Sequence, residues 1–524
     1  MKYLIAYDIG TTGVKTCLFE VDRAIRLIAC TSRAYPLYIL ENGGAEQDAD
    51  DWWSAMCAST AELLEKSDIA PDKIEGISFC SQMQGLVLVD RDGVPVHRPM
   101  SYMDQRAKEE IRRGIAHGVQ IAGANIFKLI KSLIITGAVS GSVKDPVWKY
   151  KWIEAHEPQN FARAYRWLDV KDYLLSRCTR QFVMTEDSAF ATLLYDTRPG
   201  RRGWSKTICK MLGVNMAHLP EIIRSGDRVG GLTARAAAEL GLCAGTAVYG
   251  GGGDSSLIGV GAGCVNTGDT HIYWGTSGWV ITVTDRQQVD VSAMIAAIVG
   301  AQSGKFNYFA EMETAGKCLE WAKKHLAQDE IGLYDGAQTA DTDPYDLLTQ
   351  AAAQAPVGSG GVIFTPWLHG NRCPFEDPNA TGMFFGLKLD TTKGEMIRAV
   401  LEGVCYHLRW MLENQSRKIK TSDTIRFVGG GARSDVICQM LADITGRRIE
   451  IVDEPQNVGS VGAAAVMSVG MGIIPSTESI EAFIPVTRTY EPDMQKHALY
   501  DRYYAVFRKL YGANRKLFRY LAQN

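Results

Sequence analysis

Two glycine- and hydroxyl-rich turns, about half a chain apart, constrain the fold of this 524-residue chain most strongly. The first turn is residues 8–15 and the second is residues 273–279, and short strand-like runs flank both. Each pattern predicts a β-hairpin whose tip exposes backbone N–H groups and side-chain hydroxyls. Two related hairpins in two halves of a chain predict a duplicated domain.

The length of the chain agrees with a duplication. A chain of 524 residues is too long for one hydrophobic core, and two large domains are the simplest division. A run of four glycines at 250–253 follows an apolar strand and precedes the helical pattern of residues 255–263, which is typical of a crossing between domains. We therefore expect an N-terminal domain at 1–250 and a C-terminal domain at 251–524.

The first turn carries residues that suit a bound phosphate. Gly10 lets the backbone approach a ligand closely, Thr11 and Thr12 add donors, and Lys15 adds a positive charge. Asp8 can hold a hydrated Mg²⁺ beside them. The combination predicts that the tip holds the phosphates of a nucleotide. The alternative is an ordinary hairpin in which Asp8 only ends a strand.

Two later glycine-containing segments extend this prediction. Gly275 and Thr276 occupy the tip of the second hairpin. Residues 429–431 are three glycines between a strand at 424–428 and a helix at 434–445, where backbone can lie flat against a nucleotide. The chain contains neither a Rossmann fingerprint nor a P-loop.

Composition excludes several classes of protein. The net charge of −3 leaves no basic surface for a nucleic acid. No apolar run reaches the length of about 18 residues that a membrane span needs, and the first residues do not form a signal peptide. The 12 cysteines are scattered without a Cys-x-x-Cys pair, so we expect reduced, buried thiols and a cytoplasmic location.

Hydrophobic periodicity predicts an α/β fold in which helices pack on a mixed sheet. We expect Asp50 or Asp51 to cap the helix at 52–66. Alternation of Trp148, Tyr150 and Trp152 is typical of a strand or loop face that packs into a core. The predicted strands of the first half are residues 3–7, 14–21, 25–31, 74–80 and 86–90, and further helices are predicted at 162–177, 316–326, 393–417, 459–469 and 494–521.

Six segments, taken together and in order, resemble the FGGY carbohydrate kinases, and the resemblance runs from end to end. The family has two phosphate loops, two signatures, a segment with a catalytic Asp and an adenosine loop. The segments similar to these are residues 8–15, 145–152 with Lys149 and Trp152, 253–256, 275–278, 368–387, and 429–434.

The resemblance implies two duplicated actin-like (ribonuclease H-like) domains with a central cleft. It implies ATP-dependent phosphorylation of a small sugar or polyol, with Mg²⁺, and a ketopentose such as xylulose is favoured. Asp254 is then the general base, which accepts the proton of the attacking hydroxyl. The alternative for Asp254 is the N-cap of the following helix. The residues near adenosine would be Gly430, Gly431, Ala432 and Asp435.

The sugar site is predicted from two further segments. Xylulokinases of the family typically show Gln-Met-His-Gly where this chain has Gln82-Met83-Gln84-Gly85. Met83 would pack on the sugar carbons and Gln84 would bind a hydroxyl, since an amide both donates and accepts. Asp104, in a segment similar to the family's Trp-x-Asp-x-Arg, would bind another hydroxyl, or else would cap a helix that starts near Gln105.

Several functions stay open on this evidence. The acceptor can be another polyol or a sugar acid, such as gluconate, ribulose or a glycerol-like compound. A nucleotide-binding sugar sensor would have no need of Asp254 as a base, and an actin-like or chaperone-like ATPase would not carry the two signatures. We expect a small-molecule partner, no nucleic acid and no membrane, and the oligomeric state, including a homodimer, stays open.

Overall fold

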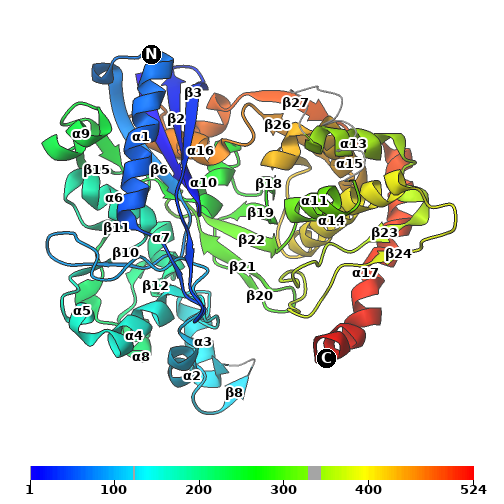
Figure 1. The fold of residues 1–524 in the computed structure, drawn as a ribbon, viewed down its shortest axis with the longest axis horizontal. Coiled ribbons are helices and arrows are strands. Elements are labelled where there is room, and N and C mark those ends of the chain that lie inside the picture. Colours follow the sequence, from blue (N-terminus) through cyan, green and yellow to red (C-terminus); the bar gives the residue numbers. More distant parts are fainter. Residues whose placement is uncertain (1, 122–123, 328–343, 524) are drawn as a thin grey trace.

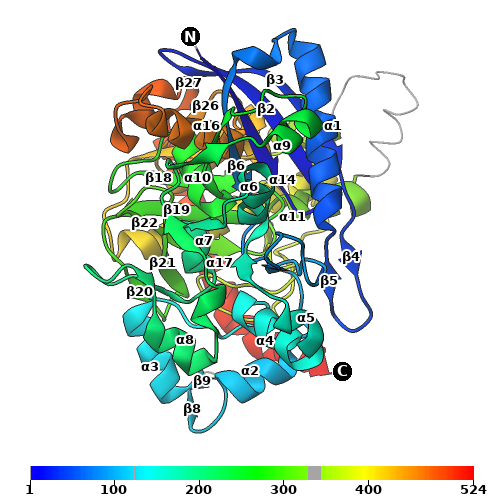
Figure 2. The same cartoon turned by 90° about the vertical axis from the view of Figure 1, so that its left-hand side faces the viewer.

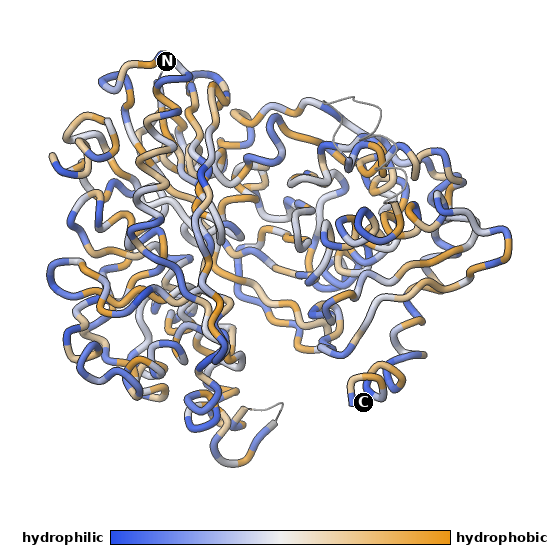
Figure 3. Tube along the Cα trace, in the orientation of Figure 1, coloured by the Kyte–Doolittle hydropathy of each residue, from blue (hydrophilic) through white to orange (hydrophobic). Residues whose placement is uncertain are grey.

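The computed structural model describes residues 2–121, 124–327 and 344–523. Two lobes lie side by side, each built around a mixed β-sheet with helices on it (Figure 1). Apolar and polar stretches alternate along the chain in both lobes (Figure 3). One hydrophobic core lies entirely within the first half of the chain, between Ile5 and Val248. The core of the C-terminal sheet is continuous with apolar residues of the first half between Leu86 and Leu219.

The first half of the chain supplies the N-terminal sheet and a smaller set of elements below it. Its strands are β1 (Lys2–Ile9), β2 (Gly13–Val21), β3 (Ile25–Ala34), β4 (Tyr38–Ile39), β5 (Ala45–Glu46), β6 (Ile74–Ser81), β7 (Val87–Val89), β8 (Gln120–Ile121), β9 (Ala124–Asn125), β10 (Arg166–Leu168), β11 (Val183–Thr185), β12 (Tyr195–Asp196), β13 (Gly203–Trp204), β14 (Glu221–Ile223), β15 (Arg228–Gly231), β16 (Ala247–Tyr249) and β17 (Gly252–Gly253). Its helices are α1 (Ala49–Ser67), α2 (Lys108–Gly114), α3 (Ile126–Ile135), α4 (Pro146–His156), α5 (Pro158–Ala162), α6 (Val170–Thr179), α7 (Glu186–Ala191), α8 (Lys206–Leu212), α9 (Ala234–Leu240) and α10 (Asp254–Gly261), with 3₁₀ turns at η1 (Pro71–Lys73) and η2 (Met216–His218).

The second half supplies the C-terminal sheet and the helices around it. Its strands are β18 (Thr270–Trp274), β19 (Gly278–Thr284), β20 (Val289–Asp290), β21 (Ile295–Val299), β22 (Phe306–Met312), β23 (Ile363–Phe364), β24 (Phe384–Phe385), β25 (Thr424–Val428), β26 (Arg448–Val452) and β27 (Val486–Tyr490). Its helices are α11 (Gly316–His325), α13 (Pro344–Gln354), α14 (Lys393–Ser416), α15 (Asp435–Thr445), α16 (Val458–Gly470) and α17 (Met494–Gln523), with 3₁₀ turns at η3 (Ser359–Gly361), η4 (Gly430–Arg433) and η5 (Thr477–Phe483).

The two sheets share one strand order, and this is the structural signature of the duplication. The N-terminal sheet runs β3-β2-β1-β6-β16-β15, and the C-terminal sheet contains the equivalent run β22-β19-β18-β25-β26-β27, which β21 and β20 extend beyond β22. In both, the five successive pairs are antiparallel, antiparallel, parallel, parallel and antiparallel. The β1–β2 hairpin therefore corresponds to β18–β19, and β6 corresponds to β25.

The glycine run at 250–253 contributes to the first sheet. Gly252 and Gly253 form β17, which pairs in parallel with the end of β6. Glycine is needed at Gly251, where φ is +65° and a Cβ would lie 2.0 Å from the carbonyl oxygen of Phe79. The predicted boundary at 250/251 thus falls just before the last strand of the N-terminal sheet.

Two glycine-containing helices, α10 and α16, lie between the two sheets (Figure 1). A Cβ on Gly261 would lie 1.9 Å from the carbonyl oxygen of Val458, and one on Gly462 would lie 2.1 Å from that of Leu257. Both positions therefore require glycine. α16 comes from the second half of the chain but packs on β1 and β6 of the N-terminal sheet, so a shared apolar core joins the lobes.

Helix α1 covers one face of the N-terminal sheet, next to β2 and β3 (Figure 2). Trp52 and Met56 are fully buried on its inner side. The helix begins at Ala49, and the Asp48 side chain accepts the Asp50 N–H, so the prediction of Asp50 or Asp51 as the N-cap is wrong. Both predicted residues lie in the first helical turn instead, where a negative charge also stabilises a helix.

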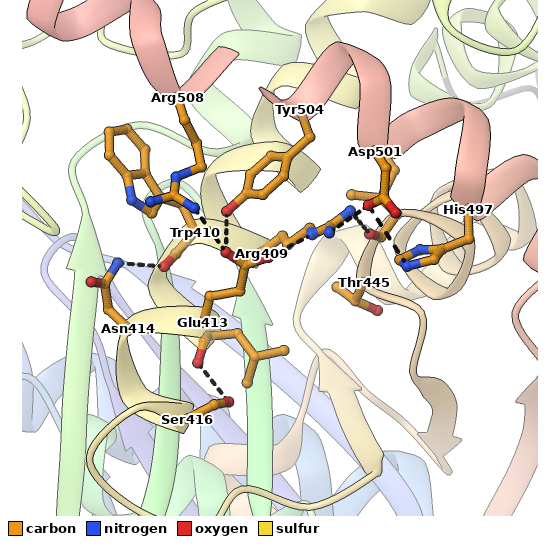
Figure 4. Close-up of polar contacts among 12 residues, drawn as sticks. Arg409, Trp410, Glu413, Asn414, Ser416, Thr445, His497, Asp501, Tyr504 and Arg508 are labelled. Atoms are coloured by element: carbon orange, nitrogen blue, oxygen red, sulfur yellow. Dashed lines mark hydrogen bonds and ion pairs between the residues drawn. The ribbon is translucent and has the colours of Figure 1, made fainter. Parts of the chain in front are cut away.

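Helix α17 is tied to the C-terminal lobe by charged side chains (Figure 4). Arg409 on α14 donates to Asp501 on α17 at 2.6 Å, and Tyr504 on α17 donates to Glu413 on α14 at 2.8 Å. Phe507 of α17 is completely buried. The last helix is therefore an integral part of this lobe, as its apolar periodicity predicts.

Two predictions of secondary structure are wrong. Trp148, Tyr150 and Trp152 lie on α4, because Pro146 at its first turn favours a helix start. The predicted helix at 162–177 is divided: Arg166–Leu168 form β10, which pairs with β7, and α6 begins at Val170 after the cap Asp169. At β10 tertiary pairing overrides the local pattern, whereas at α4 the local start signal of Pro146 was not recognised. No helix within the described ranges is long and apolar enough to cross a membrane.

Candidate active site

A cavity of about 480 Å³ lies between the two lobes and collects residues from both halves of the chain. A larger cavity, about 630 Å³, lies within the N-terminal lobe and contains none of the predicted site residues, so size does not identify the site. The predicted residues that line the cavity between the lobes are Thr11, Met83, Gln84 and Asp254.

The first hairpin brings Asp8 and Lys15 together. They lie directly opposite each other in the β1–β2 pair, next to the tip. The Lys15 ammonium donates to the carbonyl oxygen of Gln456 at 3.0 Å, just before α16. Burial raises the pKa of Asp8, while Lys15 and the Cys80 thiol lower it. Asp8 is thus a half-buried carboxylate beside one positive charge, at the end of a strand that faces the cleft.

The tip of this hairpin is held by hydrogen bonds that leave Thr11 at the cavity. Gly10 donates to the Gly13 carbonyl at 2.9 Å and accepts from the Tyr35 hydroxyl at 2.6 Å. The Thr11 carbonyl accepts from Gln47 at 2.7 Å, and Thr12 is exposed. Of the tip residues only Thr11 lines the cavity between the lobes, within the part of the chain that is described.

Asp254 is the first residue of α10. The N-cap is Gly253, so the structure does not use Asp254 as the helix cap, although its Oδ1 accepts the Ser255 N–H at 2.7 Å. Burial raises the pKa of Asp254 to about 7, and the negative charges of Asp8 and Glu311 add to the shift. A carboxylate with a pKa near neutrality can accept a proton at neutral pH and release it again.

Met83 packs directly beside this carboxylate. A Cβ on Gly253 would lie 2.1 Å from the Met83 sulfur, so only glycine allows the contact. The Ser255 hydroxyl also lies 3.2 Å from the Met83 sulfur. Gly253 in turn donates to Asp187 at 2.7 Å. Gly253, which directly precedes the candidate base Asp254, therefore also contacts Met83, the predicted apolar residue of the sugar site.

Gln84 adopts a left-handed conformation, with φ at +62°. Two buried charged groups hold it there. The Lys149 ammonium donates to the Gln84 carbonyl at 2.7 Å, and the Asp169 carboxylate accepts the N–H groups of Gln84 and Gly85, both at 3.0 Å. Burial lowers the pKa of Lys149 to about 8 and raises that of Asp169 to about 7. Left-handed backbone is costly outside glycine, so this conformation depends on its partners.

Asp104 is not brought to the cavity. Its carboxylate is fully buried, accepts the Ala45 N–H at 2.8 Å and pairs with Arg106 at 2.8 Å. Nor does it cap a helix, since α2 begins only at Lys108 with Ala107 as its N-cap. Tyr102, two residues earlier, lines the cavity instead.

A second pocket of about 380 Å³ brings together Gly275, Thr276, Gly430 and Gly431. The second hairpin and the glycine turn after β25 thus meet as the sequence predicts. Ala432 and Asp435 do not line this pocket. The Ala432 carbonyl accepts from Arg488 at 2.7 Å, and the Asp435 carboxylate accepts from Arg488 and from the Tyr490 hydroxyl. Both groups therefore contact β27.

Sequence reasoning missed several residues of the central cavity. Asp187, Trp279 and Glu311 line it, and none was predicted. Asp187 carries no local signal, because its contact with Gly253 spans 66 positions. Trp279 and Glu311 lie opposite each other on β19 and β22. Their common face could have been found from strand alternation, but the pairing of these strands was not predicted.

Within the described ranges no group of three or more His, Cys, Asp and Glu residues forms a metal cage. This agrees with the way Mg²⁺ binds, through one or two carboxylates, several waters and substrate phosphates. Asp8 offers such a carboxylate at the phosphate hairpin. The raised pKa values of Asp8 and Asp254 show that both carboxylates lack enough compensating positive charge. The residues present therefore fit a hydrated divalent cation.

Comparison with known proteins agrees with this geometry. Residues 3–261 match the N-terminal domain of the FGGY family of carbohydrate kinases, and residues 271–471 match its C-terminal domain. The chain belongs to the FGGY family of carbohydrate kinases. It is a phosphotransferase that uses an alcohol group as acceptor, and the class implies ATP as the donor.

Individual relatives divide between two acceptors. The chain is 29% identical over 517 residues to a xylulose kinase of Staphylococcus epidermidis, which covers 98% of each chain. The crystal structure of ligand-bound xylulose kinase from Lactobacillus acidophilus superposes with a TM-score of 0.85 at 25% identity, covering 99% of this chain and 100% of that one. Gluconate kinase from Lactobacillus acidophilus superposes with a TM-score of 0.84 at 26% identity, covering 98% of both. The two-domain fold is therefore that of these kinases.

Proposed function

We propose that this protein transfers the γ-phosphoryl group of ATP to a hydroxyl of a ketopentose, with xylulose as the favoured acceptor and Asp254 as the general base. The observation that carries the proposal is the cavity between the lobes. It joins the phosphate hairpin at Thr11, the carboxylate of Asp254 and the sugar-loop residues Met83 and Gln84.

The chemistry follows from these positions. A sugar hydroxyl is a poor nucleophile, and Asp254 accepts its proton as the oxygen attacks the γ-phosphorus. The new bond joins the sugar oxygen to that phosphorus, and the bond to the oxygen that bridges the β- and γ-phosphorus breaks, leaving ADP. Phosphoryl transfer otherwise needs position and neutralised charge. Gly10, Thr11, Thr12 and Lys15 would hold the phosphates at the first hairpin.

The other end of the nucleotide would lie in the second pocket. Gly275 and Thr276 present a hairpin tip there, and Gly430 and Gly431 offer backbone without side chains. Ala432 and Asp435 would support this turn from behind through Arg488. Mg²⁺, when bound, would neutralise phosphate charge, and Asp8 is the residue that would hold it.

The choice of sugar would depend on Met83 and Gln84. Met83 would pack on the carbon chain, and the Gln84 amide would bind a hydroxyl. Asp104 would act through the segment that carries Tyr102 rather than by touching the sugar. Xylulose is supported by the xylulose kinase relatives, and gluconate is the second candidate because gluconate kinase is nearly as similar in fold.

The first test is a panel of acceptors with purified protein, ATP and Mg²⁺, read as ADP release and as the mass of the phosphorylated sugar. The panel contains D-xylulose, L-xylulose, D-ribulose, xylitol, glycerol and D-gluconate. We expect the highest kcat/KM for a xylulose. If a polyol or a sugar acid is the best acceptor, the assignment of a ketopentose as the substrate is wrong. ADP release without a phosphorylated product would refute phosphoryl transfer to these acceptors.

The second test concerns the base. Asp254→Asn should lower kcat by about 10²–10⁴-fold while ATP still binds, because the amide accepts no proton. For the wild type, kcat/KM should fall as pH drops below about 7 and level off above it, since burial raises the pKa of Asp254 to about 7 and only the carboxylate form is active. Asp254→Asn with near wild-type turnover, or a flat profile between pH 5.5 and 8.5, would remove this residue from catalysis.

A further inference from the structure

One end of the central cavity carries an excess of carboxylates. Its described lining contains five acidic residues and only two basic ones, Lys144 and Arg372. The acidic residues are Asp145, Asp187, Asp254, Glu311 and Glu313. Asp254 faces the reacting groups in the proposed function, and Asp187 is engaged with the Gly253 N–H. The remaining three acids, Asp145, Glu311 and Glu313, lie close enough to Arg372 for their charges to act on it.

Both basic residues act on one carboxylate, that of Glu311. Arg372 pairs with Glu311 at 2.9 Å between Nη1 and Oε2. Burial raises the pKa of Glu311, and the charges of Arg372 and Lys144 oppose that shift. Glu313, just after the end of β22, lines the same cavity and adds a further negative charge near Glu311. The positive charge of this end of the cavity is therefore already neutralised by the protein.

Glu311 also lies where an acceptor would pass. It lies opposite Trp279 in the β19–β22 pair, and both line the cavity that contains Asp254. Its charge adds to the raised pKa of Asp254, so the two carboxylates are electrostatically coupled. A ligand with a carboxylate of its own would meet Glu311 and Glu313 as like charges and would compete with Glu311 for Arg372, which already donates to Glu311.

We propose that Glu311 is a specificity residue that reserves this site for uncharged sugars and polyols: its carboxylate takes the place beside Arg372 that the carboxylate of a sugar acid would need. The inference rests on the proposed function only in that the central cavity holds the acceptor. It separates the two acceptor classes found among the relatives, uncharged xylulose and anionic gluconate.

The test uses two probes that differ only at one carbon, xylitol and D-xylonate. Their dissociation constants are measured by calorimetry on the wild type, Glu311→Gln and the control Glu491→Gln. Glu491 pairs with Arg448 at 2.9 Å, as Glu311 does with Arg372. It directly follows β27 and does not line the central cavity, so it is a matched control. We expect the wild type to bind xylitol at least about tenfold more tightly than xylonate, and Glu311→Gln to reduce this ratio by about tenfold. Glu491→Gln should leave the ratio unchanged.

Adding Arg372→Gln to Glu311→Gln should remove the gain in xylonate binding, because the freed guanidinium is its cause. If Glu311→Gln does not fold, Glu313→Gln should shift the ratio in the same direction by a smaller factor. Xylonate binding as tight as xylitol in the wild type, or an unchanged ratio in the variants, would overturn the inference. Calorimetry measures binding without turnover, so it tests the role of Glu311 separately from the proposed function. Failure to phosphorylate any ketopentose would refute the proposed function, whereas the ratio of the two dissociation constants would still test the role of Glu311.

Discussion

The two halves of this kinase have the same sheet order but place different side chains at equivalent loops. Asp8 and Lys15 precede and follow the first hairpin tip, whereas Tyr273 and Val280 stand near the corresponding tip of the second. There, the Tyr273 ring stacks on Trp279 with centroids 4.0 Å apart. One hairpin thus offers charge and the other an aromatic surface, on the same backbone scaffold.

The loops after the equivalent strands β6 and β25 differ in the same way. Both contain a residue with positive φ, Gln84 at +62° and Gly429 at +92°. Glycine adopts this backbone without a penalty, whereas Gln84 is held by Lys149 and Asp169. A Cβ on Gly429 would lie 2.6 Å from the Trp274 carbonyl. The comparison shows that a duplicated fold can assign side-chain chemistry to one half and backbone contact to the other.

The largest expected effect tests the two hairpins against each other. Asp8→Asn should lower kcat by about 10²–10³-fold, because it removes a preorganised charge next to the transferred phosphoryl group. Tyr273→Phe, at the corresponding position, should change kcat little. The measurement is initial rate across a Mg²⁺ titration at saturating ATP and sugar. Equal losses in both variants, or full activity of the wild type in excess EDTA, would contradict this division.

The next effect concerns the sugar loop. Lys149→Met should lower the free energy of unfolding by about 3 kcal/mol, because it leaves the Gln84 carbonyl without its donor and removes a buried positive charge near Asp104 and Asp169. It should also raise KM for the sugar more than KM for ATP. Denaturant unfolding and steady-state kinetics measure both. Lys151→Met, at a partly exposed position of the same helix where the ammonium pairs with Glu154, is the control and should cost under about 1 kcal/mol. Indistinguishable variants would mean that Gln84 needs no such support.

The smallest effects separate nucleotide from sugar. Thr12→Val and Thr276→Val should each raise KM for ATP about two- to tenfold, the value of a lost hydrogen bond, with no change in the ranking of sugars. Gln84→His should alter that ranking and leave KM for ATP nearly unchanged. The measurement is kcat/KM for a panel of sugars, together with KM for ATP, on all three variants. A changed ranking in a threonine variant would contradict its role in phosphate binding. An unchanged ranking with a raised KM for ATP in Gln84→His would contradict the role of Gln84 in sugar binding.

Much of the fold could be predicted because the signals are local. Buried strands such as β1 and β25 are short apolar runs, and long helices such as α14 repeat apolar residues at helical spacing. The errors occur where pairing with a distant strand, or a helix start that was not recognised, determines the secondary structure. β10 is a strand because it pairs with β7, and α4 is a helix because Pro146 starts it.

The site divides in the same way. Residues that belong to one continuous turn, such as Gly275 with Thr276, were found because glycine and hydroxyl side chains mark a turn in the sequence. Asp104 and Asp435 were chosen from their neighbours in the sequence, and neither lines the central cavity or the second pocket, because Arg106 and Arg488 bind their carboxylates. Lys149 was noted only as part of a structural signature. Its contact with Gln84 crosses 65 positions and leaves no local pattern.

By itself the sequence determined the duplication, the order of the motifs and the glycines that each hairpin tip requires, because backbone conformation and turn chemistry depend on neighbouring residues. Only the tertiary structure decided which charges meet. The charge of Asp8 acts on Asp254, Glu311 forms an ion pair with Arg372, and α16 from the second half packs on the first sheet. These contacts join segments far apart in the chain, and burial between two lobes, which no local pattern records, sets their electrostatics.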